Sequence, residues 1–185
     1  RAIPGVTLRI VKEGGETARP GEVGEVCAYG DNIMHGYWQD PELTAGVLHE
    51  GWLHTGDLGR LDEEGFLTIE GRNNEMIKSG AYRISPTEIE EVLLQHPQIH
   101  EAGVVGIDDP ILGQRICAVV TLKEPEAVTN QDLMAYCAQR LVQYKRPRVI
   151  AVIPALPKSP SGKVLRQQLR QIGMSHSPVT APASL

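Results

Sequence analysis

The first 70 residues alternate apolar and polar side chains over short stretches, a pattern typical of half-buried β-strands. Three such stretches, each with β-branched side chains, span residues 6–11, 24–30 and 65–71. Glu64 and Gly65 predict a turn that leads into the third stretch. Pro41 is expected to begin a short helix in the long connection before it. This part of the chain is therefore predicted to be rich in β-structure.

Helical periodicity appears in the second part of the chain, most clearly over residues 85–97. Ser85 is expected to cap the N-terminus of this helix, Pro86 suits its first position, and Glu88 would complete a capping box. An apolar stripe then runs along one face of the helix, formed by Ile89, Val92 and Leu93. Pro97 ends the pattern, because the residue before a proline avoids the helical region.

The remaining segments complete a mixed order of elements. Strands are expected at residues 100–107, 114–122 and 148–153. Helices are expected at residues 129–144 and 163–172. Residues 173–185 lack apolar periodicity and are predicted to form a disordered tail. A β-rich part followed by this mixture predicts an α+β fold class.

Charge divides the 185-residue chain unevenly. Residues 1–70 carry 5 Lys or Arg against 13 Asp or Glu, whereas residues 71–185 carry 13 against 10. We therefore expect a domain boundary near Gly71, with one domain at 1–71 and a second at 72–172. The net charge of −5 argues against a nucleic-acid partner.

The composition also bears on compartment and completeness. No apolar run reaches the roughly 18 residues that a membrane-spanning helix needs, so no transmembrane segment is expected. The chain begins without a signal-like segment or an initiator Met, which predicts a fragment of a longer cytoplasmic protein. Three widely spaced cysteines, Cys27, Cys117 and Cys137, suit reduced structural thiols. No Cys/His spacing indicates a metal site, although His54 lies beside a polar motif.

Candidate chemistry concentrates in two places, GWLHTGDLG at residues 51–59 and PKSPSGKVLR at 157–166. The first is read as a Thr-Gly-Asp turn, where the carboxylate of Asp57 can accept hydrogen bonds from two neighbouring hydroxyls or simply cap the turn. In the second, Lys163 offers a mobile cation to a phosphate or a carboxylate, or opens a basic helix as a solvated side chain. The Ser-Gly before it indicates a flexible loop, and the spacing of a Walker phosphate loop is absent.

Four motifs in this order resemble the AMP-forming adenylating family, which includes acyl-CoA synthetases, adenylation domains of peptide synthetases and luciferases. They are residues 36–44, 51–59, 71–91 and 157–166. The resemblance covers roughly residues 4–171 and corresponds to the last part of such an enzyme. It implies the end of a large N-terminal domain, at residues 1–71, followed by a small mobile C-terminal domain.

The resemblance also implies roles for individual residues. Asp57 is similar to the family's ribose ligand, and Arg72 to an arginine that holds ribose or phosphate oxygens. Arg83 aligns with a phosphate contact of some CoA synthetases. Lys163 matches the lysine that bridges the carboxylate and the α-phosphate while the acyl-adenylate forms. Asn74 lies at the hinge between the two domains, where the family usually has Asp or Lys.

The family also has a path along which pantetheine passes close to the backbone, at Gly80 and Ala81. The family's glycine usually stands at the position of Ala81, so thioester formation is the less secure of the two half-reactions. The implied enzyme is an acid–thiol ligase that uses ATP, Mg²⁺ and CoA to activate a carboxylic acid, with Mg²⁺ held mainly by phosphates. The missing N-terminal part of the enzyme would carry the acid pocket, so the fragment alone is expected to be inactive.

Three other functions stay open at this point. Adenylation could be followed by transfer of the acyl group to a carrier protein instead of CoA. A luciferase-like oxygenase would use the same adenylate. A non-catalytic module would bind a nucleotide or a partner without turnover.

Overall fold

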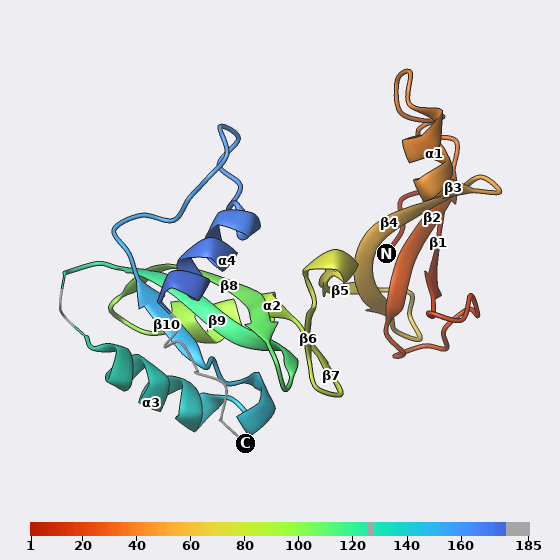
Figure 1. The fold of residues 1–185 in the computed structure, drawn as a ribbon. Coiled ribbons are helices and arrows are strands. Elements are labelled where there is room, and N and C mark those ends of the chain that lie inside the picture. Colours follow the sequence, from red (N-terminus) through yellow and green to blue (C-terminus); the bar gives the residue numbers. More distant parts are fainter. Residues whose placement is uncertain (126–127, 177–185) are drawn as a thin grey trace. The chain divides into compact units, whose positions relative to one another are not determined.

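The computed structural model describes residues 1–125 and 128–176, and the chain divides into two compact units, Arg1–Asn74 and Glu75–Leu185 (Figure 1). Each unit is built around its own β-sheet. No helix among the described residues has the length and apolar character needed to cross a membrane.

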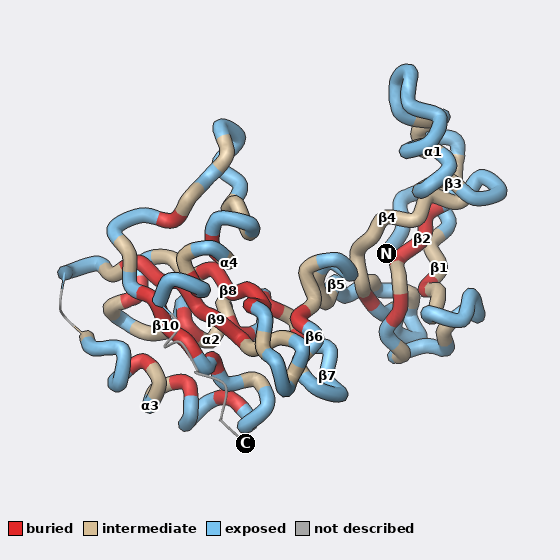
Figure 2. The backbone as a smooth tube through the Cα atoms, in the orientation of Figure 1, coloured by how far each residue is buried: buried red, intermediate tan, exposed pale blue. Residues whose placement is uncertain are grey.

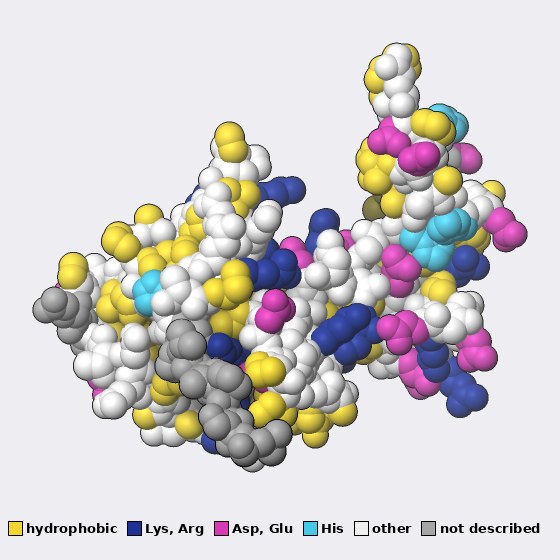
Figure 3. All heavy atoms as spheres, viewed as in Figure 1, with side chains coloured by type: hydrophobic (Ala, Val, Ile, Leu, Met, Phe, Trp, Pro, Cys, Tyr) yellow, Lys and Arg dark blue, Asp and Glu magenta, His cyan; other side chains and the backbone are white. Residues whose placement is uncertain are grey.

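The first unit is a five-stranded sheet with one short helix. All its strand pairs are antiparallel, in the order β1-β2-β4-β3, and β5 pairs with β4. Its elements are β1 (Val6–Val11), β2 (Gly24–Gly30), α1 (Pro41–Val47), β3 (Leu48–His49), β4 (Trp52–Leu61) and β5 (Leu67–Arg72). The predicted strands at 6–11 and 24–30 and the helix beginning at Pro41 are confirmed. Acidic side chains are frequent on the face of this unit seen in Figure 3, in keeping with the acidic composition of residues 1–70.

The second unit is a five-stranded sheet covered by helices. Strand β8 forms a long antiparallel hairpin with β9, and β10 pairs with β9 in parallel. The strands are β6 (Ile77–Ser79), β7 (Tyr82–Ile84), β8 (Ile99–Asp109), β9 (Gly113–Leu122) and β10 (Val149–Val152). The helices are η1 (Asn73–Glu75, which straddles the two units), α2 (Pro86–Leu94), α3 (Asn130–Arg140), η2 (Gln143–Lys145) and α4 (Arg166–Ser175). From α2 onward the strands and helices follow the predicted order, whereas β6 and β7 were not predicted, and the chain has the α+β character expected of it.

Both faces of this second sheet are buried, as the run of buried positions along β8, β9 and β10 shows (Figure 2). Successive residues of a strand point to opposite faces. Val104 accordingly packs in the cluster that includes residues of α2 and α3, whereas Val105 packs in the cluster that includes Leu169 of α4. Helices α2 and α3 therefore share one core and α4 closes the other.

The helix ends differ in part from prediction. Ser85 is the N-cap of α2, but it makes no side-chain capping hydrogen bond, and Glu88 pairs with Lys145 at 2.6 Å. The predicted capping box is thus wrong at this helix. A capping box is present instead at α3, where Thr129 and Asp132 satisfy one another's backbone N–H groups.

The last helix lies later in the sequence than predicted. Helix α4 begins at Arg166 and ends at Ser175, so Lys163 precedes it and the predicted tail is wrong for residues 173–175. Gly173 lies inside the helix because its missing side chain allows close packing. A Cβ built there would lie 2.6 Å from the sulfur of Cys117. The predicted disorder of residues 177–185 falls outside the described residues.

Candidate functional site

The Thr-Gly-Asp segment is a bulge within strand β4, and the predicted turn between separate apolar runs is wrong. Cys27 on β2 pairs with His54, and Glu25 pairs with Leu58, so residues 55–57 lie opposite a single residue of β2. Gly56 has a φ of 73°, in the left-handed region that glycine adopts without steric cost. Strand β4 therefore continues through the motif, and the bulge changes the direction of its backbone there.

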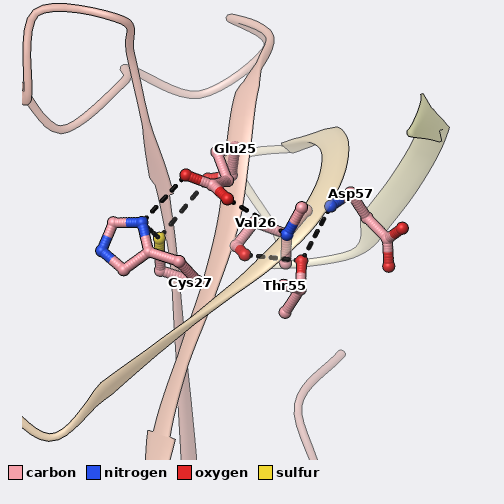
Figure 4. A network of polar contacts seen from close by, with 7 residues as sticks. Glu25, Val26, Cys27, Thr55 and Asp57 are labelled. Atoms are coloured by element: carbon pink, nitrogen blue, oxygen red, sulfur yellow. Dashed lines mark hydrogen bonds and ion pairs between the residues drawn. The ribbon is translucent and has the colours of Figure 1, made fainter. Parts of the chain in front are cut away.

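Long-range hydrogen bonds hold one side of this bulge (Figure 4). The Oε1 atom of Glu25 accepts the N–H of Gly56 at 3.0 Å, and its Oε2 lies 2.9 Å from Nδ1 of His54. All three groups are partly buried. A carboxylate contributed by the neighbouring strand therefore satisfies a backbone donor that the bulge removes from the regular ladder.

Thr55 holds the other side of the bulge. Its hydroxyl donates to the carbonyl of Val26 at 2.8 Å and accepts the N–H of Asp57 at 3.1 Å. The side chain of Asp57 points away from the Glu25 cluster (Figure 4). The polar network thus contacts the backbone of Asp57 and leaves its carboxylate directed elsewhere.

Asp57 and Arg72 are brought together by strand pairing. The two residues are partners in the β4–β5 ladder, and Nε of Arg72 lies 3.1 Å from Oδ1 of Asp57. The side chain of Asp57 is 33% exposed and that of Arg72 is 61% exposed. An anchored carboxylate beside a guanidinium can accept hydrogen bonds from hydroxyls and donate to anionic oxygens at the same place.

Cys27 joins Glu25 and His54 in a cluster that the sequence did not reveal. Its sulfur lies 3.5 Å from Nδ1 of His54, and the three side chains bring a thiol, an imidazole and a carboxylate within 4.8 Å of one another. Burial raises the pKa of the Cys27 thiol, which favours the neutral form over a metal-binding thiolate. Such donors could hold a cation, but their mutual hydrogen bonds and the bond to Gly56 account for them without one. The expectation of no metal site stays a prediction.

The segment at Gly80 and Ala81 is the turn of a hairpin that the sequence pattern did not predict. Ser79 pairs with Tyr82, which leaves these two residues as the loop between β6 and β7. Gly80 has a φ of 59°, whereas Ala81 is not among the residues with positive φ. The glycine therefore stands where the turn requires it, and the methyl group of Ala81 introduces no backbone strain. Arg83 follows on β7 as an exposed residue paired with Lys78.

Asn74 is the last residue of the first unit and lies within η1. The residue after it, Glu75, pairs with Arg166 of α4 at 3.3 Å. Arg166 also bonds to Glu90 of α2 and donates to the carbonyl of Val104 at 2.8 Å. The start of the second unit is therefore tied to two of its helices and to β8.

Lys163 lies in a loop that hydrogen bonds close, and the flexibility suggested by the Ser-Gly before it stays a prediction. Lys158 and Val164 form a bridge across the loop, and the N–H of Ser159 donates to the carbonyl of Lys163 at 2.8 Å. The N–H of Lys163 donates to the hydroxyl of Ser159 at 3.2 Å, and Gly162 supplies a φ of 81°. Lys163 itself is exposed, and its ammonium forms no ion pair within the described part of the chain. The loop thus presents an exposed cation on a backbone that is closed by hydrogen bonds.

The structure brings together only some of the predicted site residues. Asp57 and Arg72 are in contact within the first unit, which Asn74 ends. The other predicted residues, Gly80, Ala81, Arg83 and Lys163, lie in the second unit. Glu25 was missed by sequence reasoning, because its role depends on strand pairing across about thirty residues and no local motif signals it.

Comparison with known proteins agrees with this architecture. Residues 88–163 match the family model of the AMP-binding enzyme C-terminal domain. The chain is 44% identical over 165 residues to a 2-succinylbenzoate–CoA ligase of Geobacillus sp. (strain WCH70), covering 89% of this chain and 33% of the relative. It is 42% identical over 173 residues to the medium-chain fatty-acid–CoA ligase of Escherichia coli (strain K12), covering 92% and 31%.

Solved structures show the same similarity. The O-succinylbenzoate CoA synthetase of Bacillus subtilis, in complex with an acyl-adenylate, matches with a TM-score of 0.85 and 39% identity over 91% of this chain and 34% of that one. ATP-bound MatB from Rhodopseudomonas palustris matches with a TM-score of 0.85 and 30% identity over 92% and 34%. Residues 88–163 thus match the C-terminal domain of AMP-binding enzymes, and about nine tenths of the chain is similar to CoA ligases. The chain spans about a third of the length of these relatives.

Proposed function

We propose that the chain is the C-terminal part of an AMP-forming acyl-CoA synthetase. The main support for the proposal is the contact between Asp57 and Arg72. It places a carboxylate beside a guanidinium at the bulge of strand β4. The similarity to CoA ligases over about nine tenths of the chain supports it. The first unit, Arg1–Asn74, would end the large domain, and the second unit, which begins at Glu75, would form the mobile one.

The reaction would proceed in two balanced steps. A carboxylate oxygen of the acid attacks the α-phosphorus of ATP, and the bond to pyrophosphate breaks, which gives acyl-AMP. The sulfur of CoA then attacks the acyl carbonyl, AMP leaves, and the thiol proton passes to solvent. Mg²⁺, carried mainly by the phosphates of ATP, would neutralise their charge.

Each predicted site residue would have a role in this reaction. Asp57 would accept hydrogen bonds from the ribose hydroxyls. Arg72 would hold the carboxylate of Asp57 in place and donate to ribose or phosphate oxygens. Lys163 would stabilise the charge shared by the carboxylate and the α-phosphate as they join. Arg83 would contact phosphate, and the turn at Gly80 and Ala81 would lie along the pantetheine path.

Three free, buried cysteines suit a reducing compartment, so we place the enzyme in the cytoplasm. The acid is not specified by this chain, since the residues that would enclose it lie in the remaining two thirds of the relatives. For the same reason the isolated chain is expected to form no acyl-AMP.

Carboxylate-dependent exchange of pyrophosphate into ATP, measured with the complete reading frame that contains this chain, tests the proposal. Short, medium, long-chain and aryl acids serve as the panel. Exchange with one class of acid establishes adenylation and identifies that class. Folded protein that exchanges with no acid would refute the proposal and favour a non-catalytic binding module.

Lys163 separates the two half-reactions. Lys163→Ala should abolish exchange yet spare thioester formation from supplied acyl-AMP, because the second step no longer joins carboxylate to phosphate. Lys123→Ala, another exposed lysine of the same unit, is the matched control and should leave both steps unchanged. Equal loss of both steps in Lys163→Ala would contradict the assigned role.

The acyl acceptor needs a separate comparison. Similar structures include an amide bond synthetase from Marinactinospora thermotolerans, with a TM-score of 0.82 and 36% identity over 91% of this chain and 34% of that one. Once the acid is known, CoA, a carrier protein bearing phosphopantetheine, and simple amines should be offered to the acyl-adenylate. We expect CoA to be preferred, and preference for the carrier protein would establish the alternative acceptor.

A further inference from the structure

The bulge at residues 55–57 raises the question of what fixes the direction of Asp57. Gly56 has a wide choice of backbone torsions, since it has no Cβ. A residue that follows such a glycine keeps a constant direction only if the peptide planes on both sides are held. In this chain both planes are held by side chains.

Glu25 holds the first plane. The N–H of Gly56 belongs to the peptide between residues 55 and 56, and it donates to Oε1 of Glu25 at 3.0 Å. The carboxylate is in turn fixed by Nδ1 of His54 at 2.9 Å, in a pair whose side chains are 25% and 23% exposed. A hydrogen bond to a charged and partly buried acceptor is stronger than one between neutral groups.

Thr55 holds the second plane. The N–H of Asp57 belongs to the peptide between residues 56 and 57, and it donates to the hydroxyl of Thr55 at 3.1 Å. The same hydroxyl donates to the carbonyl of Val26 at 2.8 Å, which anchors it to the neighbouring strand. The bonds of Glu25 and Thr55 thus reach the backbone N–H groups of Gly56 and Asp57, whereas the carboxylate of Asp57 lies against Arg72.

We propose that Glu25 and Thr55 are positioning residues that hold the carboxylate of Asp57 in the direction needed to recognise ribose. The inference rests on the proposed function, in which Asp57 binds the ribose of ATP. Both residues act through the two peptide planes that flank Gly56, without touching the nucleotide. Loss of either contact lets the bulge relax and turns the carboxylate away from the ribose hydroxyls.

The preference of the enzyme for ATP over 2′-deoxy-ATP measures directly whether the carboxylate of Asp57 is held toward the ribose. A charged hydrogen bond to the 2′-hydroxyl corresponds to a preference of about ten- to a hundredfold in kcat/KM. The assay uses the complete enzyme with its identified acid. Thr55→Val keeps the shape of the side chain and removes both hydroxyl contacts, so it should reduce the preference for ATP at least fivefold. The kcat/KM for 2′-deoxy-ATP, which retains only the 3′-hydroxyl contact, should fall less than the kcat/KM for ATP.

Three further variants make the result specific. Thr55→Ser retains the hydroxyl and should restore the preference. Thr68→Val makes the same substitution at an exposed position of β5 and should have no effect. Glu25→Gln keeps an acceptor for Gly56 but loses the charge, and should give a smaller reduction. If Thr55→Val fails to fold, Glu25→Gln tests the positioning role in its place.

Asp57→Ala distinguishes failure of this inference from failure of the proposed function. If Asp57→Ala abolishes the preference for ATP while Thr55→Val and Glu25→Gln retain it, positioning by these residues is refuted and the ribose contact stands. If Asp57→Ala itself retains the preference, the assignment of Asp57 as ribose ligand is refuted, and the positioning role falls with it.

Discussion

Helix α4 packs on β8 so closely that one pair of residues should show a reversal of mutational effect. Leu169 is fully buried in the core under α4, and a Cβ added to Gly103 would lie 2.5 Å from its Cδ1 atom. The next neighbours of that Cβ are Leu156 and Val164, both at 3.7 Å, an ordinary contact distance. A methyl group at residue 103 therefore has room only if Leu169 is shortened.

The expected magnitudes follow from this geometry. Leu169→Ala removes most of a fully buried side chain and should lower the free energy of unfolding by about 3–5 kcal/mol. Gly103→Ala in the native core forces Leu169 or the strand to shift and should cost about 1–3 kcal/mol. In the Leu169→Ala background the same methyl group enters the cavity, so Gly103→Ala should be neutral or stabilising by up to about 1 kcal/mol.

Urea unfolding can measure these changes separately in the two units. Both tryptophans, Trp38 and Trp52, belong to the first unit, so fluorescence follows that unit. Helices α2, α3 and α4 belong to the second, so circular dichroism mainly follows that one. With a slope of about 1.5 kcal/mol per M, Leu169→Ala should move the dichroism midpoint by about 2–3 M while the fluorescence midpoint stays in place.

The sign of the Gly103→Ala effect in the two backgrounds is the decisive comparison. Equal destabilisation of wild type and Leu169→Ala would show that the two sites are independent and would refute the packing argument. A midpoint shift below about 0.3 M for Leu169→Ala would show that this core does not stabilise the unit.

Two further predictions concern the same unit. Thr129→Ala removes the N-cap of α3 and should lower the free energy of unfolding by about 1 kcal/mol in the same dichroism assay, whereas an unchanged midpoint would show that the capping box contributes nothing. Burial raises the pKa of Cys117 from 9.0 to about 12, so the unfolded thiol ionises first as pH rises and stability should fall between pH 9.0 and about 12. Cys117→Ala should show a smaller loss over this range, and an equal loss would locate the effect elsewhere.

Local patterns were sufficient to predict the elements whose signals are local. Alternating apolar and polar side chains predicted β1 and β2. A serine, a proline and an apolar stripe in that order predicted α2. Strands β6 and β7 were missed because three residues are too few to show a period. Gly173 was read as the end of a helix, yet contact with Cys117 makes glycine necessary inside it.

The residues of the candidate site likewise fall into those that a local motif predicts and those that only the fold reveals. Motif residues such as Asp57, Arg72 and Lys163 stand out in the sequence, and strand pairing then explains the contact between the first two. The bulge was read as a turn because Thr-Gly-Asp is typical of turns, and only pairing with Glu25 shows that the strand continues. Interactions between distant residues carry no signature in a single sequence.

The paired residues on either side of Asn74 bear on how the proposed hinge can work. Arg72 pairs with Asp57 in the first unit and Glu75 pairs with Arg166 in the second, so the chain passes from one set of contacts to the other within Asn73 and Asn74. A hinge at Asn74 would therefore act between two residues that each keep a partner in their own unit. Arg166 is also three positions beyond Lys163, so the residue that contacts Glu75 at the start of the second unit and the proposed catalytic cation are close neighbours in the sequence.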